Sequence, residues 1–304
     1  MSQATTQDYL KLHLIVLIWG FTAILGAVIT LPPVEIVFFR TIMAAVMIGG
    51  WMWWRGKAIR LEGKELIKVL LTGLVIASHW ILFFAAARVS NVSISLIGLA
   101  TATLWASILE PIFARRKMQW FEVLLGLTVL GGLYIILQVE FEHALGLLMS
   151  VLSGLGAATF SVLNGQYTKR HSPYQITFWE MTGATVGIAL LSPLYVRYIS
   201  ETGTLALSPT NMDWVYLFIL AGVCTVYAFS VSVELMKRIS AFSVNLAVNL
   251  EPIYGIVLAL IFLGDSEEMG QGFYMGSLVI MLSVLSYPIM NRRLKRKALE
   301  KRTL

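Results

Sequence analysis

The chain has 304 residues, of which 58% are hydrophobic and only 13% are charged, and its mean hydropathy is +0.77. A soluble globular domain carries about 25% charged residues, so this composition excludes a water-soluble enzyme and predicts a polytopic membrane protein. The net charge of +6 does not indicate a nucleic-acid partner, because the basic residues cluster in short loops and in the C-terminal tail. A single cysteine, Cys224, excludes an intrachain disulfide.

The sequence contains ten apolar segments of a length that can cross a bilayer. About 20 apolar helical residues span a hydrocarbon core of about 30 Å. In chain order these segments lie near residues 10–30, 33–54, 66–87, 91–114, 118–138, 143–168, 173–198, 213–235, 240–263 and 270–291. A polar and acidic stretch precedes the first segment, which is therefore predicted to be a retained helix and not a signal peptide. The predicted fold is all-α, with ten transmembrane helices.

The distribution of Lys and Arg predicts the orientation of these helices. If the segments alternate in direction, 20 of the 23 basic residues fall on one side, including those of the C-terminal tail. Short cytoplasmic loops of membrane proteins carry an excess of Lys and Arg. Both termini are therefore predicted to be cytoplasmic, in a multi-pass protein of the bacterial inner (plasma) membrane, and an even number of spans agrees with this.

An internal repeat relates the two halves of the chain. The pattern PxxIxFFR at 33–40 matches PxxIxFWE at 173–180, and the dipeptide IF at 112–113 matches IF at 261–262. Residues 1–140 and 141–304 are therefore predicted to be two five-helix repeats, the second of which carries the basic tail. An odd number of spans inverts the second repeat relative to the first, as in secondary transporters that bind their substrate near the midplane.

Several short motifs occur in a characteristic order: IWGF at 18–21, FFR at 38–40, AFSVNLAVNLEP at 241–252, IFLGD at 261–265, and Gly276. In these motifs and over nearly its whole length the chain resembles the drug/metabolite transporter superfamily, in particular the ten-helix EamA-type permeases. The first half departs from the family pattern, because Thr103 stands where a proline is often found. The resemblance implies a basket of helices around a cavity lined by spans 1, 3, 4, 6, 8 and 9, and export of small metabolites such as amino acids.

Glu251 is the strongest candidate for a substrate-binding residue. An ionisable group at the centre of a membrane helix costs at least about 2.5–3.5 kcal/mol on insertion scales. Pro252 removes a backbone donor beside it, which predicts a kink and a free carbonyl. The carboxylate could bind a substrate ammonium or carry a proton, and a neutral structural carboxyl is the alternative. Asn245 and Asn249 share one helix face, where they either line the pocket or bond to another helix.

His79 and Trp80 lie near the middle of the third span. The imidazole could relay protons at neutral pH, and the indole could cover a cation, while packing is the alternative for both. Further side chains from other spans are expected at the outer part of the same site, with Trp19 included on the first-span pattern of the family. These residues are Trp19, Asn164, Tyr167 and Tyr227.

Arg40 and Glu180 occupy equivalent positions in the two repeats, about seven residues inside their spans. Because the repeats are inverted, one residue is expected toward the outer face and the other toward the inner face. Each is predicted to be a gating or structural charge that pairs with a neighbouring helix end or with the other repeat, and contact with the substrate is the alternative.

The sequence lacks the motifs of several enzyme classes. Walker A, HExxH, GxSxG and CxxC patterns are absent, and the histidines have no metal-ligand spacing, so no catalytic residue, metal or cofactor is predicted. The predicted function is a secondary transporter that exports small amino-acid-like metabolites. The alternatives are a carrier for nucleosides, sugars or quaternary amines, and a membrane-embedded enzyme acting on a lipid-borne substrate. Besides substrate and bilayer, protons and a second copy of the chain remain open as partners.

Overall fold

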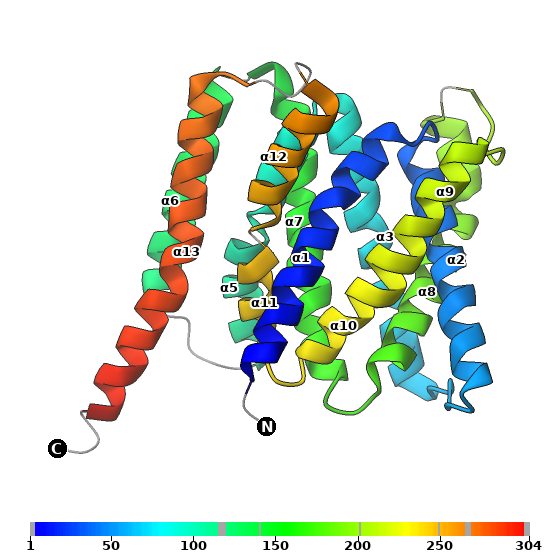
Figure 1. The fold of residues 1–304 in the computed structure, drawn as a ribbon, viewed down its shortest axis with the longest axis horizontal. Helices are drawn as coiled ribbons and strands as arrows, with labels where there is room; N and C mark the ends of the chain where they lie inside the picture. Colours follow the sequence, from blue (N-terminus) through cyan, green and yellow to red (C-terminus); the bar gives the residue numbers. More distant parts are fainter. Residues whose placement is uncertain are drawn as a thin grey trace.

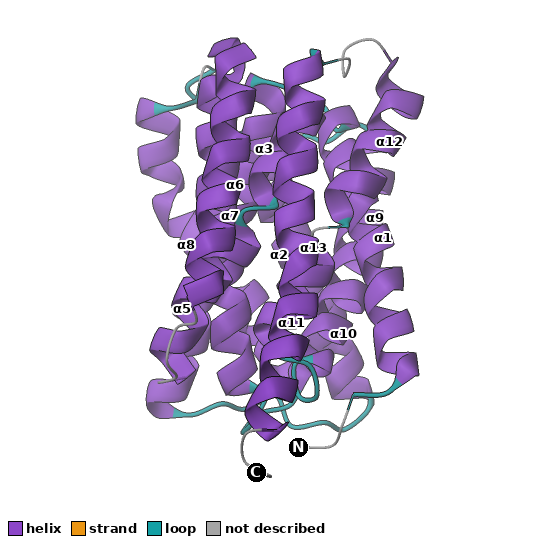
Figure 2. Ribbon diagram, turned by 90° about the vertical axis from the view of Figure 1, so that its left-hand side faces the viewer, coloured by secondary structure: helices purple, strands orange, loops and turns teal. Residues whose placement is uncertain are grey.

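The computed structural model describes residues 4–114, 120–139, 141–200, 202–248, 250–264 and 269–300. These residues form helices and connecting loops and contain no strand, which confirms the all-α prediction for the described part of the chain. Figures 1 and 2 show the helices standing side by side in a bundle, with most connections at its two ends.

The helices follow one another along the chain, and some of the bundle's helices consist of two or three consecutive segments. In order they are α1 (Thr6–Val28), α2 (Pro33–Trp54), α3 (Gly63–Val89), α4 (Val92–Leu99), α5 (Ala102–Ala114), α6 (Trp120–Val139), the short η1 (Phe141–His143), α7 (Ala144–Tyr167), α8 (Pro173–Tyr198), α9 (Asn211–Ile219), the π-helical η2 (Leu220–Tyr227), α10 (Ala228–Leu235), α11 (Ala241–Val248), α12 (Glu251–Leu263) and α13 (Gln271–Glu300).

Local sequence signals explain where several helices begin. Helix α1 starts with a capping box in which Thr5 and Asp8 exchange hydrogen bonds, and Ser172 and Gln175 form the same arrangement before α8. Pro33 and Pro173 stand at the first positions of α2 and α8, where a missing N–H costs nothing. These caps satisfy N–H groups that otherwise have no acceptor at a helix start.

Six described segments are long and apolar enough to cross a membrane. They are Thr6–Val28, Pro33–Trp54, Gly63–Val89, Val92–Phe113, Phe141–Tyr167 and Asn211–Leu235. Three shorter apolar helices occur within 124–138, 251–263 and 271–283. Many large apolar side chains on the outer surface are exposed, as expected for groups that contact lipid. The protein is therefore a multi-pass membrane protein.

The N-terminus and the α2–α3, α7–α8 and α10–α11 connections lie at one end of the bundle, the lower end in Figure 1. We call this end the basic face. The described basic residues in these connections are Arg55, Lys57, Arg60, Lys169, Arg170, Lys237 and Arg238.

Glycines allow α3 and α8 to approach at backbone distance. A Cβ atom on Gly73 would lie 2.1 Å from the carbonyl oxygen of Glu180, and one on Gly183 would lie 2.3 Å from that of Leu70. Because these neighbours are main-chain atoms, they cannot rotate away. The contact joins a helix of the first half of the chain to a helix of the second half.

Two helices of the bundle are interrupted at equivalent positions. Helix α4 ends at Leu99 and α5 begins at Ala102, whereas α11 ends at Val248 and α12 begins at Glu251. Both ends of the second interruption follow those of the first by 149 residues. The second interruption lies beside Pro252, and the kink and free carbonyl predicted there stay predictions. The interruption in the first half has no proline, and the sequence did not predict it.

A third irregularity is the π-helix η2, which connects α9 and α10. Its wider turn lets the Thr225 hydroxyl donate to the carbonyl of Leu220, five residues earlier, over 2.9 Å. The segments α9, η2 and α10 form one continuous helical span from Asn211 to Leu235. Such π segments shift the register of a helix and frequently occur at functional sites.

Candidate functional site

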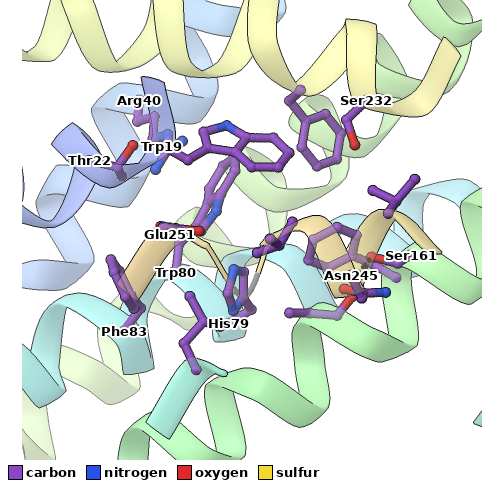
Figure 3. Close-up of a pocket in the computed structure, with 16 residues that line it drawn as sticks. Trp19, Thr22, Arg40, His79, Trp80, Phe83, Ser161, Ser232, Asn245 and Glu251 are labelled. Carbon is purple, nitrogen blue, oxygen red and sulfur yellow. Dashed lines mark hydrogen bonds between the residues drawn. The ribbon is translucent and has the colours of Figure 1, made fainter. Parts of the chain in front are cut away.

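A cavity lies in the middle of the bundle (Figure 3), with about 610 Å³ of empty space when the adjoining open solvent is included. The lining side chains come from spans 1, 3, 4, 6, 8 and 9, as the family resemblance implied, and one further residue comes from span 2. They are Trp19, Thr22, Arg40, His79, Trp80, Phe83, Leu99, Ala157, Phe160, Ser161, Phe229, Ser232, Val244, Asn245, Val248 and Glu251.

Arg40 supplies a buried positive charge to this cavity. Its side chain is 1% exposed, its Nε donates to the Thr225 hydroxyl over 2.8 Å, and its guanidinium carbon lies 3.7 Å from the ring centroid of Trp80. The terminal nitrogen Nη1 has no hydrogen-bond partner among the described residues. A guanidinium presents five N–H donors, so this nitrogen is free to bind an acceptor that enters the cavity.

Glu251 supplies the opposite charge. It is the first residue of α12, is 4% exposed, and lines the same cavity as Arg40, with which it interacts electrostatically. Figure 3 shows both residues among the side chains that surround the cavity. The start of α12 therefore places an acidic side chain in the cavity that also contains Arg40.

The π-helix η2 fixes the wall next to these charges. Trp19 donates its indole N–H to the carbonyl of Cys224 over 3.0 Å, and Thr225 holds Arg40. Both acceptors belong to η2, so the register change in this segment determines where Trp19 and Arg40 lie. The thiol of Cys224 is buried beneath the same wall.

Amide and hydroxyl groups form the other end of the cavity. Ser161 Oγ lies 3.5 Å from Asn245 Oδ1, and the Thr103 hydroxyl donates to the Asn245 carbonyl over 3.2 Å. Ser232 lines this end as well, and Figure 3 shows it with Ser161 and Asn245 on the side away from Arg40 and Thr22. The cavity thus has a charged end and a neutral polar end, with aromatic rings between them.

His79 is held by α7. Its Nδ1 lies 2.9 Å from the Ser153 carbonyl oxygen, which can only accept, so the hydrogen is assigned to Nδ1. The imidazole also packs against Phe160, with 5.5 Å between ring centroids. Its position on the cavity wall agrees with the prediction, and its role as a proton relay stays a prediction.

The structure brings together five of the nine predicted binding residues, namely Trp19, His79, Trp80, Asn245 and Glu251. Three others lie elsewhere. Asn164 and Tyr167 are buried next to the cavity wall but do not line it, and Tyr227 is 45% exposed on the outer surface. Asn249 lies outside the described residues.

Arg40 and Glu180, equivalent in sequence, have different surroundings. Arg40 faces the cavity and donates to Thr225 in the other half of the chain, whereas Glu180 is fully buried beside Asn164 in its own half. The predicted set of binding residues did not include Arg40, Thr22, Ser161 and Ser232, which also line the cavity. The FFR motif drew attention to Arg40, but the direction of its side chain depends on contacts with Thr225 and Trp80. The described residues contain no cluster suited to a metal ion.

The family model of EamA-like transporters matches residues 9–138 and again residues 144–287. The chain is 23% identical to an uncharacterized transporter, YxxF, of Bacillus subtilis over 279 residues, which covers 89% of this chain and 86% of that protein. It is 29% identical to the pseudopaline exporter CntI of Pseudomonas aeruginosa over 170 residues, 52% of this chain and 55% of that protein. A solved crystal structure with 14% identity shares the fold, with a TM-score of 0.68 over 96% of this chain and 99% of that chain. The chain is therefore a transporter and not an enzyme, and it belongs to the EamA-like transporter family.

Proposed function

We propose that this transporter is a secondary carrier that exports small amino-acid-like metabolites by alternating access around the central cavity. The observation that carries the proposal is the pair of opposite charges in one buried, otherwise largely aromatic cavity. Arg40 and Glu251 both line it and are 1% and 4% exposed. Two buried charges of opposite sign match a solute that carries a carboxylate and an ammonium group.

Each part of such a solute has a partner in the cavity. The unpartnered Nη1 of Arg40 would donate to the carboxylate, and hydrogen bonds to charged groups contribute about 1.5–3 kcal/mol each. Glu251 would accept from the ammonium group. Trp19 and Trp80 would cover the aliphatic part, and Asn245 at the far end would bind a polar side chain. A nucleoside or a sugar has no group that needs both charges, and a quaternary amine needs only the carboxylate.

The architecture that fits this function is ten transmembrane helices in an inverted repeat, residues 1–140 and 141–304, with both termini in the cytoplasm of a bacterium. Three observations support it. The family model matches the chain twice, the two helix interruptions are 149 residues apart, and the described basic loops lie at the same end of the bundle as the N-terminus. Each interruption borders the cavity, through Leu99 in one half and Glu251 in the other.

Export as the direction of transport is supported by the relative named as a pseudopaline exporter. Alternating access is itself reversible, so the solute and ion gradients across the membrane determine the direction.

The experiment that tests the function is counterflow in proteoliposomes loaded with a mixed amino-acid pool. Radiolabelled amino acids outside should exchange saturably with the internal pool. Glu251→Gln removes the negative charge of the cavity and is expected to abolish the exchange. The matched control is Glu142→Gln, which alters an exposed carboxylate in η1, outside the cavity, and should exchange like the parent protein.

Three results would count against the proposal. Equal exchange by the parent protein and Glu251→Gln would return Glu251 to a structural role. Exchange that is absent for every amino acid would remove this substrate class. Exchange of nucleosides, sugars or quaternary amines in the same vesicles would then identify a carrier of the alternative class.

A further inference from the structure

A second buried polar cluster lies outside the central cavity, where α3, α7 and α8 meet. Glu180 is fully buried, its Oε2 lies 3.5 Å from Asn164 Nδ2, and its Oε1 has no hydrogen-bond partner among the described residues. Asn164 Oδ1 and the Thr177 hydroxyl are also buried without a partner. Three unpartnered polar atoms in one place are unusual, because most buried polar groups are hydrogen-bonded.

The cluster provides no counter-charge for an ionised Glu180. No ion pair among the described residues includes Glu180. The charged or titratable groups on the helices packed against α8, and on α7, are Glu35 and Arg40 on α2, Lys64, Glu65, Lys68, His79 and Arg88 on α3, Tyr167 on α7, and Glu234 on α10. Lys68 bonds to Glu65 over 2.8 Å and is 57% exposed, and Arg40 is engaged by Thr225 and Trp80.

A proton on Glu180 would remove the need for a counter-charge and would provide a donor for the unpartnered acceptors. The ionised form places an unpaired charge in a medium of low polarity, which costs several kcal/mol. Oε1 of Glu180 and Oδ1 of Asn164 can only accept hydrogen bonds while Glu180 is ionised. Protonation removes the charge and turns one of the acceptors into a donor.

A stripe of polar side chains connects the cluster with the cavity and with the basic face. Ser161, Asn164 and Tyr167 follow one another at intervals of three residues, so each is next to the following one on the surface of α7. Ser161 lines the cavity, Asn164 contacts Glu180, and the Tyr167 hydroxyl lies 3.0 Å from Thr72 Oγ1. The Thr72 hydroxyl in turn bonds to the carbonyl of Lys68, near the beginning of α3.

The cluster also lies on the contact between the two halves of the chain. Helix α3 belongs to residues 1–140, whereas α7 and α8 belong to residues 141–304, and Gly73 brings the α3 backbone against the carbonyl of Glu180. A change of charge at a packed contact shifts the balance between two arrangements of the elements that meet there. Proton binding at this position can therefore bias the movement of one half against the other.

We propose that Glu180 binds and releases a proton during transport and couples solute movement to the proton gradient. This inference rests on the proposed carrier function. It separates the proton site from the solute site, because Glu180 lies outside the cavity that contains Arg40 and Glu251.

Infrared spectroscopy tests proton binding without a substrate. Reconstituted protein is titrated over pH, and the absorption of protonated carboxyl groups is recorded for the parent protein, Glu180→Gln and Glu180→Asp. A carboxyl band should disappear as pH rises, be missing in Glu180→Gln, and return with a shifted titration in Glu180→Asp. Identical carboxyl spectra of the parent and Glu180→Gln, or a Glu180 band that does not respond to pH, would overturn the proposal.

Flux measurements test the coupling with the same amino-acid pool. An imposed pH gradient should drive net amino-acid movement in the parent protein and in Glu180→Asp but not in Glu180→Gln, whose counterflow should lose its pH dependence. Gradient-driven movement by Glu180→Gln would contradict the proposal. Absence of counterflow in the parent protein would instead refute the carrier function. The infrared titration would then show independently whether Glu180 binds a proton. Gel filtration and thermal unfolding show whether each variant is folded.

Discussion

At the scale of single residues, the protein shows how local surroundings give related positions different roles. Arg40 and Glu180 occupy equivalent places in the internal repeat. The π-helix η2 offers Arg40 the hydroxyl of Thr225, and Trp80 covers its guanidinium. Glu180 has no comparable partner and is enclosed between helices. One position has therefore become part of the cavity, while the other lies in a helix contact.

Replacement of Arg40 should weaken solute binding specifically. Arg40→Gln removes the donor proposed for the solute carboxylate, and the loss of a charged hydrogen bond of about 1.5–3 kcal/mol corresponds to a rise of about 10- to 150-fold in the half-saturating concentration. Saturation curves of counterflow measure this rise. Arg197→Gln, at an exposed position near the end of α8, is the matched control and should leave the curve unchanged. Equal curves for all three proteins would show that Arg40 does not contact the solute.

At the scale of helices, close contacts determine which pairs can form. Gly183 and Gly187 of α8 pack against Leu70 and Leu74 of α3. Gly276 of α13 packs against the carbonyl of Gly132 on α6. These small residues therefore serve contacts within the chain, where backbones approach more closely than larger side chains allow.

Gly183→Ala should destabilise the protein by separating α3 from α8. Its new methyl group would meet the carbonyl of Leu70 at 2.3 Å, and overpacking of this kind typically costs about 1–3 kcal/mol. The apparent unfolding temperature in detergent should fall by about 2–10 °C. Gly131→Ala on α6 is the control, because a Cβ there meets no atom within 4 Å. An unchanged unfolding temperature in Gly183→Ala would mean that the two helices have room to move apart.

At the scale of the whole molecule, α1 is tied at both of its ends to the second half of the chain. At the basic face Arg238 donates to the Asp8 carboxylate through Nε and Nη2, over 3.0 and 2.7 Å. At the other end Asp213 accepts from the N–H and the hydroxyl of Thr30, over 2.8 and 2.7 Å. Alternating access requires each end to separate in turn, so these ties are expected to contribute to gating.

Arg238→Gln should therefore increase access to the cavity from the basic face. A partly exposed ion pair contributes about 0.5–1 kcal/mol, which corresponds to a rise of about 2- to 5-fold in the open fraction. The rate at which a polar thiol reagent modifies Ser232→Cys reports this access, since the native Cys224 is buried. Lys237→Gln, at the exposed neighbouring position, is the control. An equal rate in both variants would show that this ion pair does not restrain the basic face.

The orientation of the whole molecule can be measured with reporters fused to either terminus. The excess of Lys and Arg in the loops of the basic face predicts that both termini are cytoplasmic. A fluorescent protein that folds only in the cytoplasm should be bright at either end, and a periplasmic phosphatase should be inactive there. A phosphatase that is active at either terminus would refute the predicted topology.

The sequence by itself determined the membrane environment, the all-helical fold and the family. Long apolar segments have no stable alternative to helices inside a bilayer. Motifs such as AFSVNLAVNLEP can be recognised by their order and spacing in one sequence, and they indicate the family. The sequence also drew attention to Glu251, His79 and Trp80, which line the cavity, because polar or aromatic groups at the centre of an apolar span are conspicuous.

Only the tertiary structure decided which of the candidates meet. Helical periodicity gives the face of a residue but not the helix that covers it. The direction of Arg40 depends on η2, and a π-helix of ordinary apolar residues such as Leu220–Tyr227 has no sequence signal. The interruption between Leu99 and Ala102 contains no proline, so the sequence has no signal that marks it either. Asn164 and Tyr167 lie beside Glu180 and not in the cavity because contacts between distant helices, made possible by Gly73 and Gly183, determine which groups share a space.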